Sequence, residues 1–384
     1  MKISMGPCRV VSMAPVSEKR WGFWNFPYLF RMPDGALGLT HHVDHDSEDA
    51  YGKAAPFFVS RDEGRTWSSL TPPCPELGLH PTFMMHLEGG ECFTSVCRGV
   101  IPIQRLRSSE PVGSLWSYGK TDLYDLASVP PEERYLPMVR WLPDRQAWVS
   151  EKGVLDVPQA LFWGRDGQVS TIFLESKPIL DREGVILTAD FRIPIRLADG
   201  STPTQRGTLL LESVDRGHTW RLRSIVACDR ETMYAEPFLA YAPNGDLLCT
   251  LRSTSSETKD CPLYLARSRD DGHTWSVPEQ IAEVGVFPNI LTLGCGVTVI
   301  SFGRPGLWLM FSEDGAGRQW GERRTLVEPD PLNNCSATCG YSSMEALDSH
   351  RFLVAYTNFR CPDEAGVPRK TVLVQEVCVE EKDD

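Results

Sequence analysis

A pattern of the form Ser-x-Asp-x-Gly-x-Thr-Trp occurs three times, at Ser60–Trp67, Ser213–Trp220 and Ser268–Trp275. A fourth copy, Ser312–Trp320, carries one inserted residue. In such a segment the aspartate can accept hydrogen bonds from its own turn, the glycine can adopt positive φ, and the tryptophan can pack beneath. Each copy follows a short, β-prone run. The pattern therefore predicts four hairpin turns, each at the end of a strand.

The spacing of the copies predicts the architecture. Their first serines are 153, 55 and 44 residues apart. Blades of four strands need about 40–50 residues each, so the long interval fits three blade steps with two copies degenerate or absent. Five steps give six blades. We expect strands at Arg351–Tyr356 and Lys370–Gln375 to complete the last blade, with Cys8–Ser12 pairing there to close the ring.

The expected fold is thus all-β, a single six-bladed β-propeller domain covering residues 1–384. The net charge is −12, which opposes binding to nucleic acid. An anionic small substrate would need a local basic pocket. No run of 18 apolar residues occurs, so no membrane-spanning helix is expected.

The twelve cysteines do not form a zinc or disulfide pattern. The close pairs, Cys92 with Cys97 and Cys335 with Cys339, are not Cys-x-x-Cys motifs. We expect reduced, mostly buried thiols in a cytoplasmic protein, or a secreted one if a leader has been removed. No pattern demands a cofactor, and the oligomeric state is not readable.

The four patterns resemble the aspartate boxes, or BNR repeats, of the sialidase (neuraminidase) superfamily. The resemblance spans nearly the whole chain and implies a sialidase-type propeller. The box specifies fold far better than function, because it lies on the outer rim and also occurs in proteins that are not sialidases.

The resemblance also implies a site. A retaining sialidase holds the substrate carboxylate with an arginine cluster, attacks with a glutamate-activated tyrosine, and protonates the leaving group with a carboxylic acid. Matching segments place Glu236 as the activating glutamate, Arg252 and Arg304 as carboxylate ligands, and Tyr341 as the nucleophile.

The N-terminal half departs from the family. Asn25 stands where the first arginine is expected, and as a substrate-binding residue it can hydrogen-bond a carboxylate but cannot neutralise it. An Arg-Ile-Pro triplet does occur, but at Arg192, in the position of another blade, so Arg192 is a possible substitute. His80 stands where the family often has an acidic residue that touches the substrate, which indicates an altered subsite.

The acid/base is expected on the loop from Thr40 to Asp49. Asp46 is favoured over the other acids of that loop. Its histidines offer a second proton-handling set, with His42 as a substrate-binding candidate, and a less favoured metal site could form from His41, Asp44 and His45. The alternatives left open for the acid/base are Asp44, Asp49, His41, His42 and His45.

The leading function is an exo-acting, retaining glycoside hydrolase that releases a terminal acidic sugar from a glycan through Tyr341. The first alternative is a propeller hydrolase or lyase that acts on a uronate- or arabinose-containing glycan through the histidine-rich loop. The second is a carbohydrate-binding propeller without catalysis.

Overall fold

The computed structural model describes the chain except residues 80–82, 255–261, 331–332, 334 and 381–384. Nearly all of its regular structure is strand. The one α-helix, within the described residues, is α1 (Glu48–Tyr51), and the 3-10 segments are Pro75–Gly78, Ile103–Arg105, Leu126–Ser128 and Pro131–Glu133. The all-β prediction is therefore confirmed.

Four of the sheets are four-stranded. The first is β2 (Asn25–Arg31), β3 (Leu37–His42), β4 (Phe57–Ser60) and β5 (Ser68–Ser69). The next two are β19 (Met233–Tyr241), β20 (Leu247–Thr254), β21 (Leu263–Ser268) and β22 (Glu279–Ala282), then β23 (Val286–Thr292), β24 (Thr298–Gly303), β25 (Leu307–Ser312) and β26 (Arg324–Val327). The last is β27 (Ser342–Ala346), β28 (Arg351–Pro362), β29 (Pro368–Glu380) and β1 (Lys2–Met13).

An eight-stranded sheet consists of two antiparallel four-stranded halves. Parallel pairing of β12 with β18, through Val154 to Asp156, joins the halves. One half is β6 (Met85–His86), β7 (Cys92–Ser95), β11 (Leu136–Leu142) and β12 (Ala147–Asp156). The other is β15 (Ile179–Leu180), β16 (Ile186–Asp190), β17 (Thr208–Ser213) and β18 (Thr219–Ala227).

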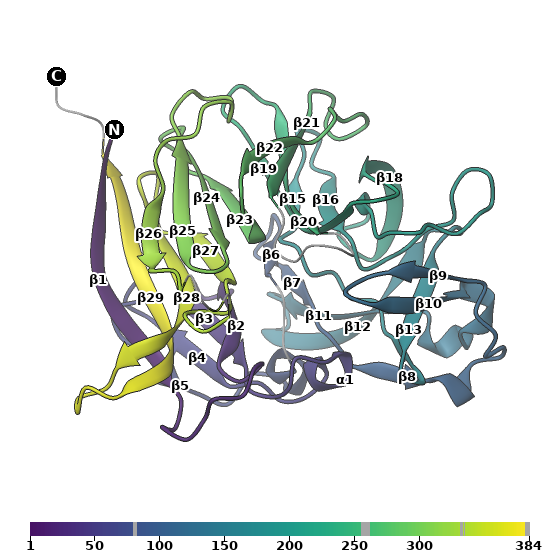
Figure 1. Cartoon of the computed structure of the whole chain (residues 1–384), viewed down its shortest axis with the longest axis horizontal. Coiled ribbons are helices and arrows are strands. Elements are labelled where there is room, and N and C mark those ends of the chain that lie inside the picture. The colour runs from purple at the N-terminus through teal and green to yellow at the C-terminus, as the bar shows by residue number, and fades with distance from the viewer. Residues whose placement is uncertain (80–82, 255–261, 331–332, 334, 381–384) are drawn as a thin grey trace.

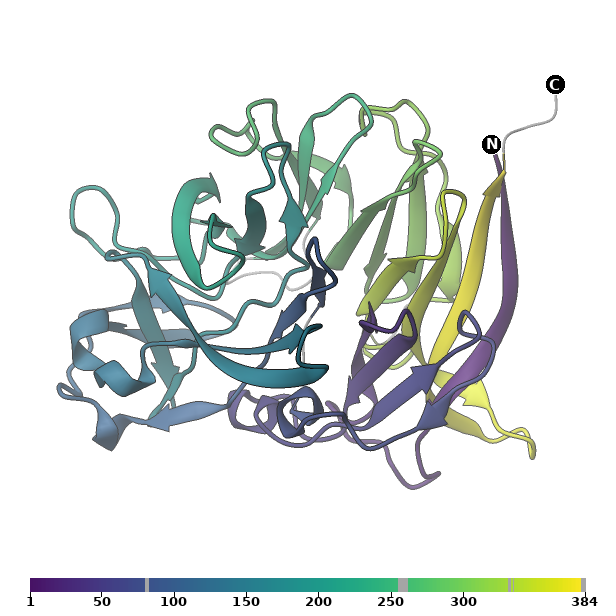
Figure 2. The same ribbon diagram turned by 180° about the vertical axis from the view of Figure 1, so that it is seen from behind.

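A five-stranded sheet, called here the inserted sheet, comes from the chain on either side of β11 and β12. Its strands are β8 (Val100–Pro102), β9 (Gly113–Trp116), β10 (Lys120–Asp125), β13 (Leu161–Arg165) and β14 (Gln168–Ser170). Figures 1 and 2 show the other sheets standing around a common centre, with the inserted sheet at one end of the molecule.

The predicted closure of the ring is confirmed. β1 pairs antiparallel with β29, and the register sets Cys8 opposite Gln375 and Val10 opposite Leu373. The first strand of the chain therefore completes the sheet built by its last three strands, and β1 and β29 lie side by side (Figure 1).

The four box segments form turns after the third strand of their sheets, β4, β17, β21 and β25. In the Ser268 turn, the Asp270 carboxylate accepts hydrogen bonds from the hydroxyl and the backbone N–H of Thr274, at 2.6 and 2.9 Å. The Ser268 hydroxyl donates to Asp270 and accepts from the backbone N–H of Gly272, at 2.7 and 2.8 Å. The expected turn chemistry is confirmed.

The interpretation of the long interval was wrong. Between the first box and the second, the chain adds one four-stranded half-sheet (β6, β7, β11 and β12) and the inserted sheet, rather than two further blade units. An insertion lengthens the interval just as an extra blade would, so spacing alone could not separate the two.

Four aromatic rings contact one another in series at the centre of the molecule. Tyr28 contacts Phe83, Phe83 contacts Phe238, and Phe238 contacts Phe287, with ring centroids 5.3, 5.4 and 4.9 Å apart. All four side chains are buried. These edge-on contacts join β2, β19 and β23 through Phe83, which precedes β6, so the core holds those strands at fixed positions around the centre.

The cysteines differ in part from expectation. All eleven that the structure describes are free thiols, as expected, but only Cys92, Cys97, Cys249 and Cys339 are buried. Among the described residues, no helix has the length and apolar character needed to cross a membrane.

The Ser268 turn generates a stability prediction. Hydrogen bonds from the Thr274 side chain and then its backbone lower the pKa of Asp270 to about 2. Asp270→Ala should lower the free energy of unfolding by about 1 kcal/mol, allowing for the solvent exposure of the turn. Urea denaturation at pH 7 measures this loss.

The difference between wild type and variant should persist above about pH 4 and shrink as the pH falls toward 2, because the native carboxylate then becomes protonated. Asp144→Ala removes an exposed carboxylate without hydrogen bonds and serves as the control. A loss that does not change between pH 7 and pH 2 would contradict the assignment.

Candidate active site

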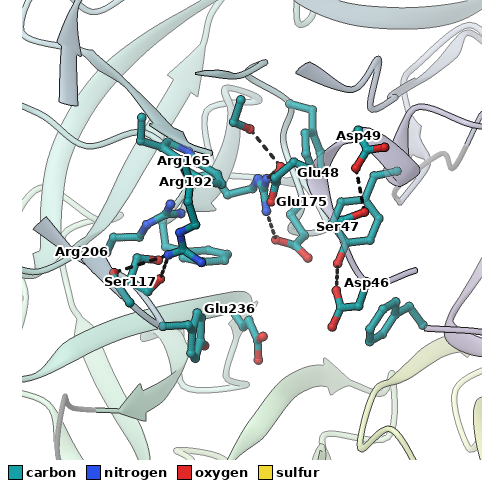
Figure 3. A pocket seen from close by; sticks show the side chains of 18 of the residues that line it. Asp46, Ser47, Glu48, Asp49, Ser117, Arg165, Glu175, Arg192, Arg206 and Glu236 are labelled. Atoms are coloured by element: carbon teal, nitrogen blue, oxygen red, sulfur yellow. Dashed lines mark hydrogen bonds and ion pairs between the residues drawn. The ribbon is translucent and has the colours of Figure 1, made fainter. Parts of the chain in front are cut away.

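A cavity of about 1140 Å³ opens at the centre of the sheets. Its walls come from the loop and helix after β3, from the inserted sheet, from the end of β16, and from the inner edges of β19 and β20. Figure 3 shows the labelled arginines of the wall mainly on one side of the cavity and Asp46, Glu48 and Asp49 on the other. The cavity wall thus carries charges of both signs.

Glu236 is the centre of the hydrogen-bond network in this cavity. Its Oε1 accepts hydrogen bonds from the Tyr341 hydroxyl and from Arg252 Nη1, the latter at 2.8 Å. Its Oε2 accepts the backbone N–H of Phe287 at 2.8 Å. Three sheets therefore meet at one buried carboxylate, and the structure brings together Glu236, Arg252 and Tyr341 as the sequence predicted.

A bulge in β19 aims Glu236 into the cavity. The pairing of β19 with β20 shifts register between Ala235 and Phe238, and Glu236 has a φ of 48°. Phe26 in β2 and Phe287 in β23 share these features, with φ values of 51° and 47° at equivalent register shifts. Each of the three residues precedes a proline. A bulge re-aims a side chain at the cost of local strain, so the repetition marks these as positions that shape the site.

Two of these bulges hold Tyr341. Its ring stacks on Phe287, with centroids 4.2 Å apart, and contacts Phe26 at 4.6 Å. Burial, followed by the charge of Glu236, raises the pKa of the Tyr341 phenol well above its usual value. The phenol is therefore protonated at neutral pH, and its hydroxyl donates a hydrogen bond to Glu236.

Arg304 also lines the cavity. Its Nε and Nη2 donate to the carbonyl of Cys339 at 3.0 and 2.9 Å, and its guanidinium lies 5.2 Å from the ring centroid of Trp21. These contacts fix the plane of the guanidinium, which favours recognition of a planar anion.

Arg192 lines the cavity as well, and its charge is balanced by Glu48, with Glu175 close by. Its Nη2 donates to Glu48, and its Nη1 lies 3.8 Å from Glu175. The guanidinium is also 4.2 Å from the ring centroid of Phe173. Arg192 is therefore placed to orient these acids, and it is not a free cation facing the substrate.

The loop before α1 contributes Asp46 to the cavity wall, and α1 itself contributes Asp49. Asp46 accepts hydrogen bonds from Trp21 Nε1 at 2.7 Å and from the Tyr51 hydroxyl. Asp44 does not line the cavity and binds Lys53 at 3.0 Å. Of the three acids considered, Asp46 is thus oriented by two donors inside the cavity.

The loop histidines do not line the cavity. His41 is buried and stacks on Phe58, and burial lowers its pKa to about 4. The His42 ring contacts Phe26 and Tyr51 and forms a hydrogen bond with the carbonyl of His45. His42 therefore packs against two residues that line the cavity. Within the described part of the chain, no group of three metal-ligating side chains is present.

Asn25 is fully buried and does not line the cavity. With its amide oriented to satisfy its hydrogen bonds, it donates to the carbonyls of Phe23 and Trp24 and accepts from the N–H of Gly22. Asn25 therefore holds the entry to β2 instead of facing a ligand. His80 lies outside the described residues.

Sequence reasoning missed several residues of the cavity wall. Glu175 lines it, and burial raises the pKa of this carboxyl to about 8, although Arg192 opposes the rise. The only sequence signal for Glu175 was an acid just after an apolar run. Other lining residues that were missed include Glu48, Tyr51, Trp116, Ser117, Tyr118, Trp163, Arg165 and Arg206.

Several solved structures share this fold. A protein of unknown function from Dyadobacter fermentans DSM 18053 is 17% identical, with a TM-score of 0.66 over 98% of this chain and 99% of that chain. An α-L-arabinofuranosidase from Fusarium graminearum is 13% identical, with a TM-score of 0.57 over 96% and 97% of the two chains. A Hadza microbial sialidase is 16% identical, with a TM-score of 0.55 over 91% of this chain and 65% of that chain.

No protein-family profile matches the chain, and no curated protein sequence matches it. The likenesses therefore establish the fold alone. It is an all-β, sialidase-like propeller fold, found in enzymes described as sialidases and as an α-L-arabinofuranosidase.

The Glu236 network generates a prediction that does not depend on activity. The Arg252 and Glu236 side chains are only 6% and 4% exposed. Arg252→Met would leave a buried carboxylate without its cation and should cost about 3 kcal/mol in the free energy of unfolding. The double variant Arg252→Met/Glu236→Gln should recover part of that loss. Urea denaturation measures both.

Arg61→Met removes a solvent-exposed ion pair with Asp34 and should cost less than about 1 kcal/mol. Strictly additive losses in the two single variants and the double variant would show that Arg252 and Glu236 are not coupled.

Proposed function

We propose that this protein is a retaining, exo-acting glycoside hydrolase that releases a terminal acidic sugar, of the sialic acid class, from a glycan. The observation that supports this most directly is the hydrogen bond from the Tyr341 hydroxyl to a buried glutamate in the central cavity. A phenol that donates to a carboxylate can become a nucleophile without a net charge that the acidic substrate would repel.

The chemistry proceeds in two balanced steps. The Tyr341 oxygen attacks the anomeric carbon while its proton passes to Glu236, and Asp46 protonates the departing glycosidic oxygen. Water then attacks the same carbon, Asp46 takes a proton from that water, and the phenol oxygen leaves with the proton returned by Glu236. Two displacements at one carbon retain its configuration.

Two arginines that line the cavity, Arg252 and Arg304, support the proposal of an acidic substrate. Arg304 is held in one plane by the Cys339 carbonyl, and Arg252 presents its guanidinium beside Glu236. Together they are placed to hold the substrate carboxylate next to Tyr341. Arg192 is paired with Glu48, and Asn25 is turned away from the cavity, so we assign neither of them to the carboxylate.

We further propose that the fold is one six-bladed propeller domain over residues 1–384. The four four-stranded sheets and the two halves of the eight-stranded sheet supply the blades. The inserted sheet stands outside this count and walls the cavity.

A second candidate function rests on Glu175. The carboxyl of Glu175 is protonated at neutral pH because burial raises its pKa to about 8, and it shares the cavity with Glu236. A protonated acid and an ionised carboxylate on either side of a glycosidic bond are the usual pair of a glycosidase that needs no tyrosine. The α-L-arabinofuranosidase neighbour makes a furanoside of arabinose the sugar to try.

Tyr341→Phe should abolish release of sialic acid from a fluorogenic sialoside, with a fall in kcat of about a thousandfold or more, because the phenol oxygen forms the covalent intermediate. The unfolding temperature should stay near that of the wild type. Tyr264→Phe makes the same change on β21, away from the cavity, and serves as the control. Sialidase activity that survives in Tyr341→Phe would show that Tyr341 is not the nucleophile.

Under the second candidate, Tyr341→Phe should keep activity on an arabinofuranoside while Glu175→Gln loses it. The activity of the wild type should then fall as the pH rises through about 8, because Glu175 must be protonated to act as the acid. A pH–rate profile on both substrates measures this. Equal activity of Glu175→Gln and the wild type would exclude Glu175 as the acid.

A further inference from the structure

Arg206 is a buried cation in the wall of the cavity. It lies in the segment between β16 and β17, and the residue is only 3% exposed. Its guanidinium stacks 4.1 Å from the ring centroid of Trp163 in the inserted sheet and 5.7 Å from that of Phe191. The planar group is therefore held by apolar and aromatic surfaces.

No acid forms an ion pair with Arg206 within the described part of the chain. Its Nε and Nη2 are buried without a hydrogen-bond partner, and no ion pair is formed. The nearby acids have other hydrogen-bond partners: Oδ1 of Asp190 accepts the N–H groups of Arg192 and Ile193 while its Oδ2 has no partner, and Glu48 binds Arg192.

The buried charge of Arg206 destabilises the unliganded protein. Burial, followed by the neighbouring charge of Arg192, lowers the pKa of Arg206 to about 9. A buried charge without a counter-ion destabilises a fold, and such groups occur where a ligand supplies the missing partner. An oxyanion that enters the cavity would supply Arg206 with the missing partner.

The inserted sheet brings this position close to the Glu236 network. The N–H of Trp116 donates to Thr204 at 2.9 Å, and Trp116 forms a bridge with Gln205. The Arg206 carbonyl accepts the N–H of Tyr234 at 3.2 Å, two residues before Glu236 on β19. Two strand residues span about 7 Å of backbone, so Arg206 and Glu236 extend from neighbouring stretches of the chain into the same cavity.

We propose that Arg206 is an anion-binding subsite for an oxyanion, a uronate carboxylate or a sulfate ester, on the sugar next to the one that is cleaved. This inference rests on the proposed function for the glycan nature of the ligand. It adds a second acidic position to the substrate, apart from the carboxylate assigned to Arg252 and Arg304. Figure 3 shows Arg206 beside Arg165 and Arg192 on the arginine side of the cavity.

Isothermal titration calorimetry with small glycosides tests the subsite without requiring turnover. The probes are methyl glucuronide, methyl glucoside 6-sulfate and neutral methyl glucoside. The wild type should bind at least one charged probe about tenfold more tightly than the neutral one. The preferred charged probe identifies the source of the oxyanion. Because hydrolysis is not measured, the proposed catalytic function can fail while this preference stands.

Arg206→Gln should erase the preference for the charged probe and leave neutral binding unchanged, and Arg206→Lys should keep part of it. Arg196→Gln removes an arginine that pairs with Asp125 outside the cavity, and it serves as the control. Arg206→Gln should also raise the unfolding temperature, by about 2 °C, because it removes an unpaired buried charge.

Three results would overturn the proposal. The first is equal binding, or no binding, of the charged and neutral probes by the wild type. The second is an unchanged preference in Arg206→Gln. The third is a lowered unfolding temperature together with lost binding, which would make Arg206 a packing residue.

Discussion

The buried carboxylate of Glu236 is the point on which the central cavity depends. It accepts hydrogen bonds from Arg252 on β20, from the N–H of Phe287 on β23, and from Tyr341 just before β27. Ionised carboxylates inside a protein need several donors, and here three donors from separate strands supply them. The same contacts that stabilise the charge also fix where three sheets meet. Structure and chemistry therefore depend on one group.

The charges of the cavity wall divide into those already paired and those open to a ligand. Arg192 is held by Glu48 and Glu175, which removes it from direct recognition of an anion. Arg206 has no such partner among the described residues, and the inserted sheet covers it with Trp163. A propeller of ordinary blades would lack that cover. The inserted sheet thus forms one side of the cavity and places Trp163 over Arg206, the residue proposed to bind a second anion.

The sequence predicted local chemistry well and long-range placement only in part. The box turns and the closing pair of β1 with β29 follow from residues close in sequence or from strand-forming runs, and both are confirmed. Glu236, Arg252 and Tyr341 could be predicted because each lies in a recognisable segment. Arg206, Glu175 and the inserted sheet could not, because no local pattern shows that a distant loop will pack over the centre. Asn25 shows the converse, since its position suggested a ligand contact while its amide caps the backbone before β2.

The central claim is that Tyr341 is the nucleophile and Glu236 its base. Covalent labelling of the nucleophile tests this claim most directly. A fluorinated sialoside that forms its glycosyl-enzyme quickly and loses it slowly would label the nucleophile, and mass spectrometry of the digested protein would locate the label. The account predicts a single sugar adduct on the phenol oxygen of Tyr341, and slower labelling when Glu236 is replaced by glutamine. An adduct on Glu236 or Glu175, or labelling at an unchanged rate in that variant, would contradict it.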